Sequence, residues 1–137
     1  MLRTAPRLLL TALLATSSVA CATKVAAPAD APALGSDARI VAKKNKTGTY
    51  AVSVELMNLA PPSRLDPAAQ SFVVWFVAGE EAPVRAGVLA YDEGDRRGAL
   101  EATTPGRVFD VMITLEKEPA PAEPSPRSIL RAKVAAR

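Results

Sequence analysis

The sequence contains no histidine, one cysteine, Cys21, and one tryptophan, Trp75. Histidine is the commonest general base and the commonest metal ligand in proteins, so its absence removes the usual acid–base and metal chemistry. A single cysteine cannot form an intrachain disulfide, and without histidine no Cys/His zinc site can be assembled. The sequence also lacks a nucleophile elbow, an S-x-x-K motif and a P-loop. We therefore expect no enzymatic activity, no cofactor and no metal.

Charges of the two signs nearly balance. The chain has 17 basic and 14 acidic residues, and the basic count falls to 15 if Arg3 and Arg7 are removed with an N-terminal signal. A nearly neutral chain lacks the electrostatic footprint of a nucleic-acid-binding protein, so no nucleic-acid partner is expected. The one basic cluster, Lys43-Lys44-Asn45-Lys46, is expected to be a solvated turn, with contact to anionic lipid headgroups or polymers as the alternative.

Residues 1–20 have the order of a secretory signal peptide. Arg3 and Arg7 precede the apolar run Leu8–Ala15, and small residues continue to Ala20. The apolar run is shorter than the roughly 20 residues that a membrane-spanning helix needs. The alternative is a buried or transmembrane N-terminal helix.

The stretch Ser17-Ser18-Val19-Ala20-Cys21 resembles the lipobox of bacterial lipoproteins, with Ser18 where leucine is commonest. The resemblance implies cleavage before Cys21 and lipidation of that residue by several acyl chains, palmitate among them, which would hold the protein firmly in a membrane. Lipidation also accounts for a lone cysteine in an exported protein. Ala22 favours the outer membrane under the enteric sorting rule. The alternative is ordinary cleavage after Ala20, which releases a protein with a free thiol.

The mature chain divides into a linker and one domain. Residues 21–37 are rich in alanine and proline and show no apolar period, so we expect a disordered tether that lifts the domain off the membrane. Residues 38–137 are enough for one small domain with its own core.

Alternating and continuous apolar runs predict strands throughout residues 38–137. Tyr50, Val52, Val54 and Leu56 alternate with polar or small residues, and Phe72–Val77 is apolar on both faces, as in a central strand. The seven predicted strands lie near residues 39–42, 50–56, 72–77, 84–89, 98–102, 109–115 and 130–134. One helical turn is expected after residue 66. This pattern predicts an all-β fold, a single immunoglobulin-like antiparallel β-sandwich.

Three further features have a structural and a functional interpretation. Trp75 is expected to anchor the core or a sheet face, with a binding platform as the alternative. The acidic group Asp92, Glu93 and Asp95 is expected in a solvated hairpin, with Ca²⁺ binding as the alternative. The proline-rich stretch 119–126 is expected to be a rigid, exposed connection, with recruitment of a partner as the alternative.

Four motifs lie along residues 72–130. They are Phe72-Val73-Val74-Trp75, Gly87-Val88-Leu89, a strand from Phe109 to Thr114-Leu115-Glu116, and a loop ending at Pro126 before Ile129-Leu130. In these motifs the sequence resembles the extracytoplasmic C-terminal domain of anti-sigma-K factors. Those regulators carry a sigma-binding segment and a transmembrane helix before this domain, and this sequence shows neither. Its loop 117–120 is also richer in proline than the family's glycine-rich loop. The resemblance therefore implies a fold and a side of the membrane rather than inhibition of a sigma factor.

Together these features predict a lipid-anchored, non-catalytic cell-envelope protein that serves as a binding or structural module. Its partners would be the membrane, through the lipid on Cys21, and another envelope protein. The alternatives are an extracytoplasmic sensor or modulator in an anti-sigma-factor circuit and, less in keeping with the composition, a periplasmic enzyme.

Overall fold

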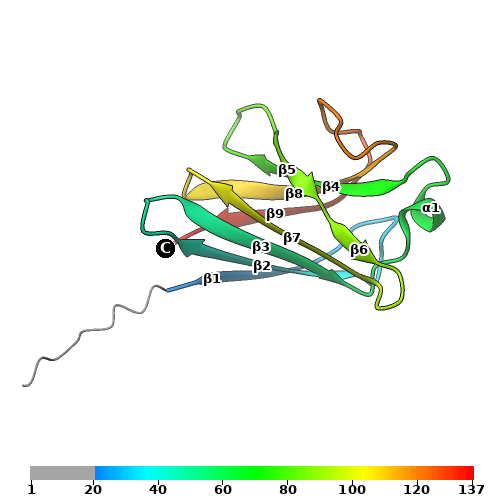
Figure 1. Cartoon of the computed structure of the whole chain (residues 1–137), viewed down its shortest axis with the longest axis horizontal. Coiled ribbons are helices and arrows are strands. Elements are labelled where there is room, and N and C mark those ends of the chain that lie inside the picture. Colours follow the sequence, from blue (N-terminus) through cyan, green and yellow to red (C-terminus); the bar gives the residue numbers. More distant parts are fainter. Residues whose placement is uncertain (1–20) are drawn as a thin grey trace, which may run out of the picture.

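The computed structural model describes residues 21–137, and the predicted signal peptide, residues 1–20, lies outside them. Within the described residues the chain forms nine strands and one short helix (Figure 1). They are β1 (Thr23–Pro28), β2 (Asp37–Lys44), β3 (Tyr50–Met57), α1 (Pro62–Leu65), β4 (Ser71–Val77), β5 (Val84–Val88), β6 (Ala90–Asp92), β7 (Arg97–Thr104), β8 (Val108–Glu116) and β9 (Ser128–Ala135). In this part of the chain no helix has the length and hydrophobicity that a membrane crossing requires.

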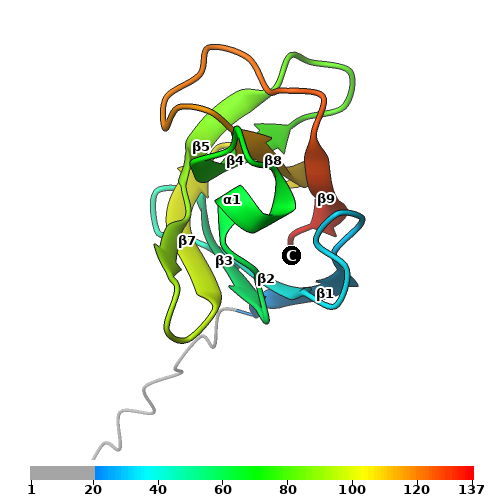
Figure 2. The ribbon, with the colours of Figure 1, turned by 90° about the vertical axis from the view of Figure 1, so that its right-hand side faces the viewer.

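The strands form two antiparallel sheets that face each other. Sheet A has the order β1-β2-β3-β7-β6, and sheet B has the order β5-β4-β8-β9. Figure 2 looks along the sandwich and shows α1 across one of its open ends. Apart from β1, the order corresponds to the ABED and CFG sheets of immunoglobulin-like domains, with β5 added beside strand C. The predicted antiparallel sandwich is confirmed, and its strand order is compatible with the immunoglobulin-like class.

Alternation along the strands builds the core between the sheets. In β3, Tyr50 and every second residue after it are buried, while the residues between them face outward. Sheet B contributes aromatic rings, and the rings of Phe76 and Phe109 lie 5.2 Å apart between their centres. Burying one such ring contributes about 1.5–3 kcal/mol to folding. The buried residues of this core all come from residues 29–136, so residues 21–137 contain a complete folding unit.

Residues 23–36 are ordered, and the predicted tether is wrong. β1 pairs with β2 at six register positions, from Thr23 opposite Ala42 to Pro28 opposite Asp37. Residues 29–36 then pack against the sandwich, where Ser36 Oγ donates a hydrogen bond of 2.9 Å to a backbone carbonyl. The domain therefore begins at residue 23 rather than 38. β1 is an edge strand, a position that tolerates proline, and its pairing with β2 compensates for the small area that its alanines bury.

Two smaller features also differ from the prediction. The helical turn comes before Asp66 rather than after it, since Pro62 stands at the start of α1, where proline is favoured. The backbone N–H of Asp66 closes the turn by donating to the carbonyl of Pro62 at 2.9 Å. The short strand β6 is not among the seven predicted strands, and the turn follows its last residue, Asp92, whose carboxylate accepts a hydrogen bond from the N–H of Asp95.

Candidate functional site

Cys21 lies at the surface directly beside the sandwich. Its side chain is exposed and forms no disulfide, and only Ala22 separates it from Thr23, the first residue of β1. Two residues span at most about 7 Å. Thr23 is held on two sides, because it pairs with Ala42 of β2 and its Oγ1 accepts a hydrogen bond of 3.1 Å from the N–H of Arg137. Any group attached to Cys21 is therefore joined to a rigid part of the fold.

We call this end of the sandwich the anchor end. It comprises residues 21–24, the β2–β3 hairpin (residues 43–50), the β7–β8 turn (residues 104–108) and residues 133–137. The strand register places these four segments together, and Figure 1 shows the start of β1, the hairpin and the C-terminus at the same end. The opposite end carries α1 and the β8–β9 loop.

A cleft of about 590 Å³ opens at this opposite end. One wall is the segment that follows α1, residues 66–69, and the other is the β8–β9 loop, residues 117–127. The end of β8, at Leu115 and Glu116, lies between the walls. Since β8 runs from the anchor end to this point, the cleft and Cys21 are separated by the length of the sandwich.

The β8–β9 loop folds back over the outer face of sheet B, as both ribbon views show (Figures 1 and 2). Pro121 is buried, and its carbonyl accepts a hydrogen bond of 2.7 Å from the guanidinium of Arg85 in β5. The carbonyl of Glu118 accepts one of 3.1 Å from Ser71 Oγ in β4. The predicted exposed connection is therefore wrong in part. Its prolines limit the loop's freedom, and these contacts fix it to the sheet.

A buried chain of hydrogen bonds lies under this loop. Trp75 Nε1 donates to Thr114 Oγ1 at 2.9 Å, and Thr114 Oγ1 donates to a carboxylate oxygen of Glu116 at 2.6 Å. The same oxygen accepts the N–H of Ser125 at 2.7 Å. Each polar group thus has a partner, which burial requires. The network joins β4, β8 and the loop.

Trp75 is confirmed as a sheet-face anchor. It is 1% exposed and lies in a small apolar cluster with Val73, Val77 and Met112, separate from the core between the sheets. Because so little of its ring is exposed, Trp75 offers no platform to a ligand. This second cluster explains why β4 is apolar on both faces.

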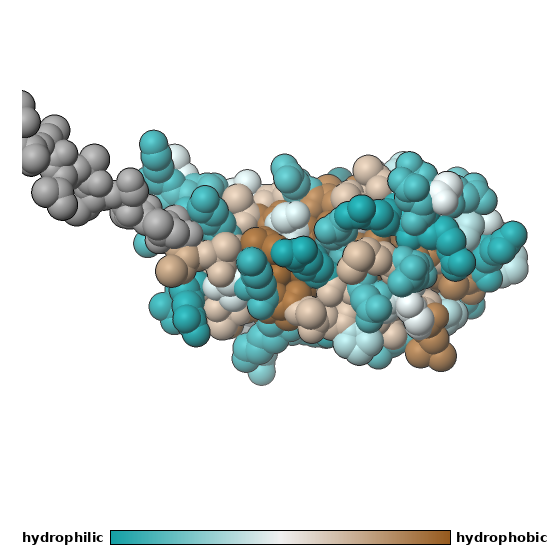
Figure 3. Space-filling view, turned by 90° about the horizontal axis from the view of Figure 1, so that it is seen from below, coloured by the Kyte–Doolittle hydropathy of each residue, from teal (hydrophilic) through white to brown (hydrophobic). Residues whose placement is uncertain are grey.

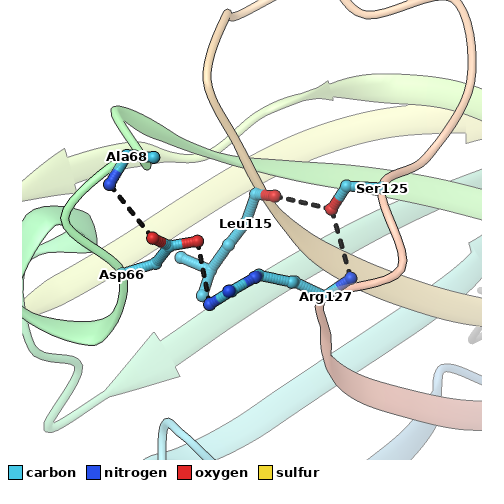
Figure 4. Close-up of polar contacts among 5 residues, drawn as sticks. All are labelled: Asp66, Ala68, Leu115, Ser125 and Arg127. Atoms are coloured by element: carbon cyan, nitrogen blue, oxygen red, sulfur yellow. Dashed lines mark hydrogen bonds and ion pairs between the residues drawn. The ribbon is translucent and has the colours of Figure 1, made fainter.

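An ion pair connects the two walls of the cleft (Figure 4). Asp66 Oδ1 accepts the N–H of Ala68 at 3.0 Å, and Asp66 Oδ2 pairs with the guanidinium of Arg127 at 2.9 Å. The Asp66 side chain is 14% exposed, whereas that of Arg127 is 57% exposed. On the loop side, Ser125 Oγ donates to the carbonyl of Leu115 at 2.7 Å and accepts the N–H of Arg127 at 3.2 Å.

The cleft combines charged groups of both signs with apolar surface. Carboxylates and two cations lie among alanine and proline side chains, and the volume falls in the range of pockets that take small ligands. Within the cleft, the Ser125 hydroxyl donates its hydrogen bond to the carbonyl of Leu115. An activated serine nucleophile would instead donate to a general base. The arrangement is suited to binding a partner with polar and apolar groups.

The outer face of sheet A is a weaker candidate. It carries two open hollows of about 320 and 420 Å³, lined mainly by small side chains of β1, β2, β3 and β7. Figure 3 views the molecule from below Figure 1, and hydrophilic side chains there separate small hydrophobic patches. Among the described residues, no network of side-chain hydrogen bonds borders these two hollows, whereas such a network borders the cleft.

The other residues singled out by sequence lie apart from the cleft. Asp92, Glu93 and Asp95 are exposed around the β6–β7 turn, as predicted for a solvated hairpin. Among the described residues no three potential ligands gather closely enough to hold a metal ion. The cluster from Lys43 to Lys46 lies in the exposed β2–β3 hairpin.

Tyr91 is a half-buried phenol between β6 and the segment that leads into α1. Its hydroxyl donates a hydrogen bond of 2.5 Å to the carbonyl of Leu59, and its ring packs edge-on against Phe72 at 5.6 Å. Burial raises the pKa of the Tyr91 phenol above its ordinary value of about 10. The neutral phenol therefore holds β6 against the segment that leads into α1.

The sequence raised partner recruitment as the alternative for residues 119–126, which line one wall of the cleft, but it did not show which residues meet there. Asp66 is far along the chain from Glu116, Ser125 and Arg127, and no sequence motif joins it to them. The turn-forming dipeptides Asp66-Pro67 and Ser125-Pro126 predict that the chain bends at these two places. They do not predict that the two bends lie close together in the fold. The residues meet because β4 and β8 are neighbours in sheet B.

Comparisons with protein-family models, with curated proteins and with solved structures find no match to this chain. The motifs that resemble anti-sigma-K factors lie on β4, β5, β8 and β9, mostly at buried positions of sheet B. They are positions that support the fold, and they include no side chain of the Asp66–Arg127 pair.

Proposed function

We propose that this protein is a lipid-anchored, non-catalytic cell-envelope protein that serves as a binding module. It is held in the membrane through acyl chains on Cys21 and presents the cleft at its opposite end to an envelope partner. The observation that carries the proposal is the position of Cys21. It follows a lipobox-like sequence, it is exposed, and it lies one residue ahead of the first paired strand.

The placement of Cys21 supports the anchor on physical grounds. An exposed residue at the edge of the fold can be acylated without disturbing the core, and several acyl chains bind a membrane far more firmly than one. Ala22 favours the outer membrane as the site of attachment.

The cleft supports the binding role. The Arg127 side chain is more than half exposed although its guanidinium is paired with Asp66, so the remaining N–H groups of the guanidinium can meet a carboxylate or carbonyl of a partner. The alanine and proline surface beside it would bury apolar groups of the same partner. We expect an envelope protein segment that carries both kinds of group.

Mass spectrometry tests the anchor. The mature wild-type protein and the Cys21→Ser variant are purified from membrane and soluble fractions, and their intact masses are compared. We expect the wild type to begin at Cys21 with added acyl mass in the membrane fraction, and the variant to lack that mass. A soluble wild type without acyl mass would refute the anchor.

Photo-crosslinking in intact cells tests the cleft. A photoreactive amino acid is placed at Ala122 in the cleft and, as the control, at exposed Ala99 on the outer face of sheet A. We expect a distinct adduct from position 122 only. The same adducts from both positions, or none from position 122, would contradict a binding role for the cleft.

The second role, a sensor or modulator in an anti-sigma-factor circuit, rests on the resemblance of residues 72–130. A deletion strain tests it. Altered expression of envelope-stress genes, restored by the wild-type protein, would favour the sensor, and unchanged expression would count against it.

A further inference from the structure

The lysines of this protein are gathered at the end that carries Cys21. All six lysines lie in the described part of the chain, and five of them belong to the anchor end, where Arg107 and Arg137 are also exposed. The five are Lys24, Lys43, Lys44, Lys46 and Lys133. The sixth, Lys117, stands at the opposite end, beside the cleft.

Backbone pairing holds these lysines in place. Thr23 is opposite Ala42, so Lys43 and Lys44 follow directly beside the start of β1. The hairpin that presents Lys46 is closed by a hydrogen bond of 2.7 Å from the N–H of Asn45 to the carbonyl of Thr49. The basic groups therefore project from a rigid end of the sandwich, close to the residue that we propose is acylated.

The charges at the anchor end have few acidic neighbours. The ion pairs among the described residues join Arg97 to Glu55, Arg127 to Asp66 and Arg131 to Asp110, and none includes a lysine. Two exposed acidic residues, Glu80 and Glu81, lie in the β4–β5 loop, which is at the same end of the sandwich because Val77 of β4 is opposite Asp110 near the start of β8. That loop rises from sheet B on the side away from β1 (Figure 1). Glu101 of β7 is exposed and lines the same hollow as Lys43, and Asp110 of β8 is opposite Lys133 but forms its ion pair with Arg131. The anchor end thus keeps an excess of positive charge.

We propose that the anchor end is a membrane-docking face, in which the lysines of the β2–β3 hairpin contact the anionic phospholipid headgroups around the acylated Cys21. This rests on the proposed anchor and adds an orientation to it. The predicted tether, residues 21–37, could have held the hairpin lysines up to roughly 60 Å from the bilayer. The observed spacing of two residues, about 7 Å, brings the start of β1 within the Debye length of about 8 Å at physiological salt.

Docking at this face would fix the direction of the whole domain. Because the cleft lies at the other end of β8, it would point away from the membrane, toward a partner in the surrounding compartment. Each lysine near an anionic surface strengthens membrane partitioning by roughly fivefold, and the effects of the three hairpin lysines on partitioning multiply.

Vesicle binding tests the face without the lipid anchor. Residues 21–137 carrying Cys21→Ser are mixed with vesicles of phosphatidylcholine alone or with added phosphatidylglycerol, at low and physiological salt. The test variant adds Lys43→Gln, Lys44→Gln and Lys46→Gln. The matched control removes three exposed cations from the opposite end, Arg64→Gln, Arg96→Gln and Lys117→Gln, and so has the same net charge.

We expect the parent protein to bind the phosphatidylglycerol vesicles, more weakly at higher salt, and the hairpin variant to lose at least tenfold in partitioning. The control should stay within about threefold of the parent, because its charges face away from the surface. No preference for phosphatidylglycerol, or equal losses in the two variants, would overturn the proposal. Thermal melting of each variant checks that these exposed substitutions leave the fold intact.

A second measurement uses the acylated wild-type protein in isolated membranes. An amine-reactive reagent should label Lys117 faster than Lys46, because the hairpin is covered by headgroups. Equal labelling would overturn the orientation. The acyl mass on Cys21 is measured separately, so a failed docking face and a failed anchor give different results.

Discussion

Replacing Glu116 with alanine should loosen the β8–β9 loop and destabilise the domain. Glu116 is 6% exposed, and its carboxylate accepts hydrogen bonds from Thr114 Oγ1 and from the N–H of Ser125. Thr114 Oγ1 in turn accepts the indole N–H of Trp75. Glu116→Ala removes the common acceptor and leaves two donors to find new partners.

The magnitude follows from these two bonds. Hydrogen bonds to a charged group contribute about 1.5–3 kcal/mol each, and water entering from the open cleft replaces part of the loss. We expect Glu116→Ala to lower the free energy of unfolding by about 2–4 kcal/mol. For a domain of this size, that corresponds to a decrease in Tm of roughly 8–16 °C.

Two variants serve as controls. Glu116→Gln keeps an oxygen in the same position and exchanges charged for neutral hydrogen bonds, so it should cost only about 1 kcal/mol. Glu118→Ala removes an exposed carboxylate two residues away and should change stability by less than about 0.5 kcal/mol.

Urea unfolding measures all three variants, followed by the fluorescence of the single tryptophan and by far-UV circular dichroism. Coincident transitions for the two signals would show two-state unfolding, which the free energies require. If Glu116→Ala unfolds within about 0.5 kcal/mol of the wild type, the buried network does not stabilise the loop as argued. A loss in Glu116→Gln as large as in Glu116→Ala would show that the charge, not the acceptor position, matters.

Three further predictions concern other parts of the fold. Val25→Asp should lower the free energy of unfolding in urea by at least about 1–2 kcal/mol, because Val25 packs against the core. Ala26→Asp, on the exposed face of β1, should change this free energy by less than about 0.5 kcal/mol. Equal, small effects of the two substitutions would restore the tether interpretation. The raised pKa of Tyr91 contributes stability that is present below about pH 10 and is lost as the pH rises through the folded-state pKa. The urea midpoint of the wild type should therefore fall at alkaline pH, and Tyr91→Phe should weaken that fall. An unchanged fall in the variant would contradict this role. Arg127→Gln should lower the free energy of unfolding by no more than about 1 kcal/mol, since the ion pair with Asp66 is partly solvated. The same substitution should abolish the crosslinked adduct formed from position 122. A retained adduct would exclude a contact through this guanidinium.

The strands could be predicted because their signal is local. The alternation from Tyr50 to Leu56 places every second side chain on one face, and β3 buries that face as predicted. The continuous apolar run Phe72–Val77 predicted a central strand, and β4 lies inside sheet B with β5 and β8 as neighbours. Its second buried face is explained by the Trp75 cluster beneath the β8–β9 loop.

The error at residues 23–36 has a physical cause. Stretches of alanine and proline bury little surface by themselves, so their composition is typical of a linker. β1 is stabilised by six positions of pairing with β2 and by the contacts that residues 29–36 make with distant segments. Such long-range contacts leave no periodic pattern in a sequence this poor in large side chains.

The sequence by itself determined the all-β class, most strand positions, and the chemistry that can be excluded for lack of histidine and further cysteine. The lipobox-like segment before Cys21 also identified this residue as the predicted site of lipidation. Only the tertiary structure decided that Cys21 adjoins a paired strand, that the hairpin lysines lie beside it, and that Asp66 meets Arg127 across a cleft at the other end. The difference arises because strand formation depends on neighbouring residues, whereas these three arrangements depend on which strands pair.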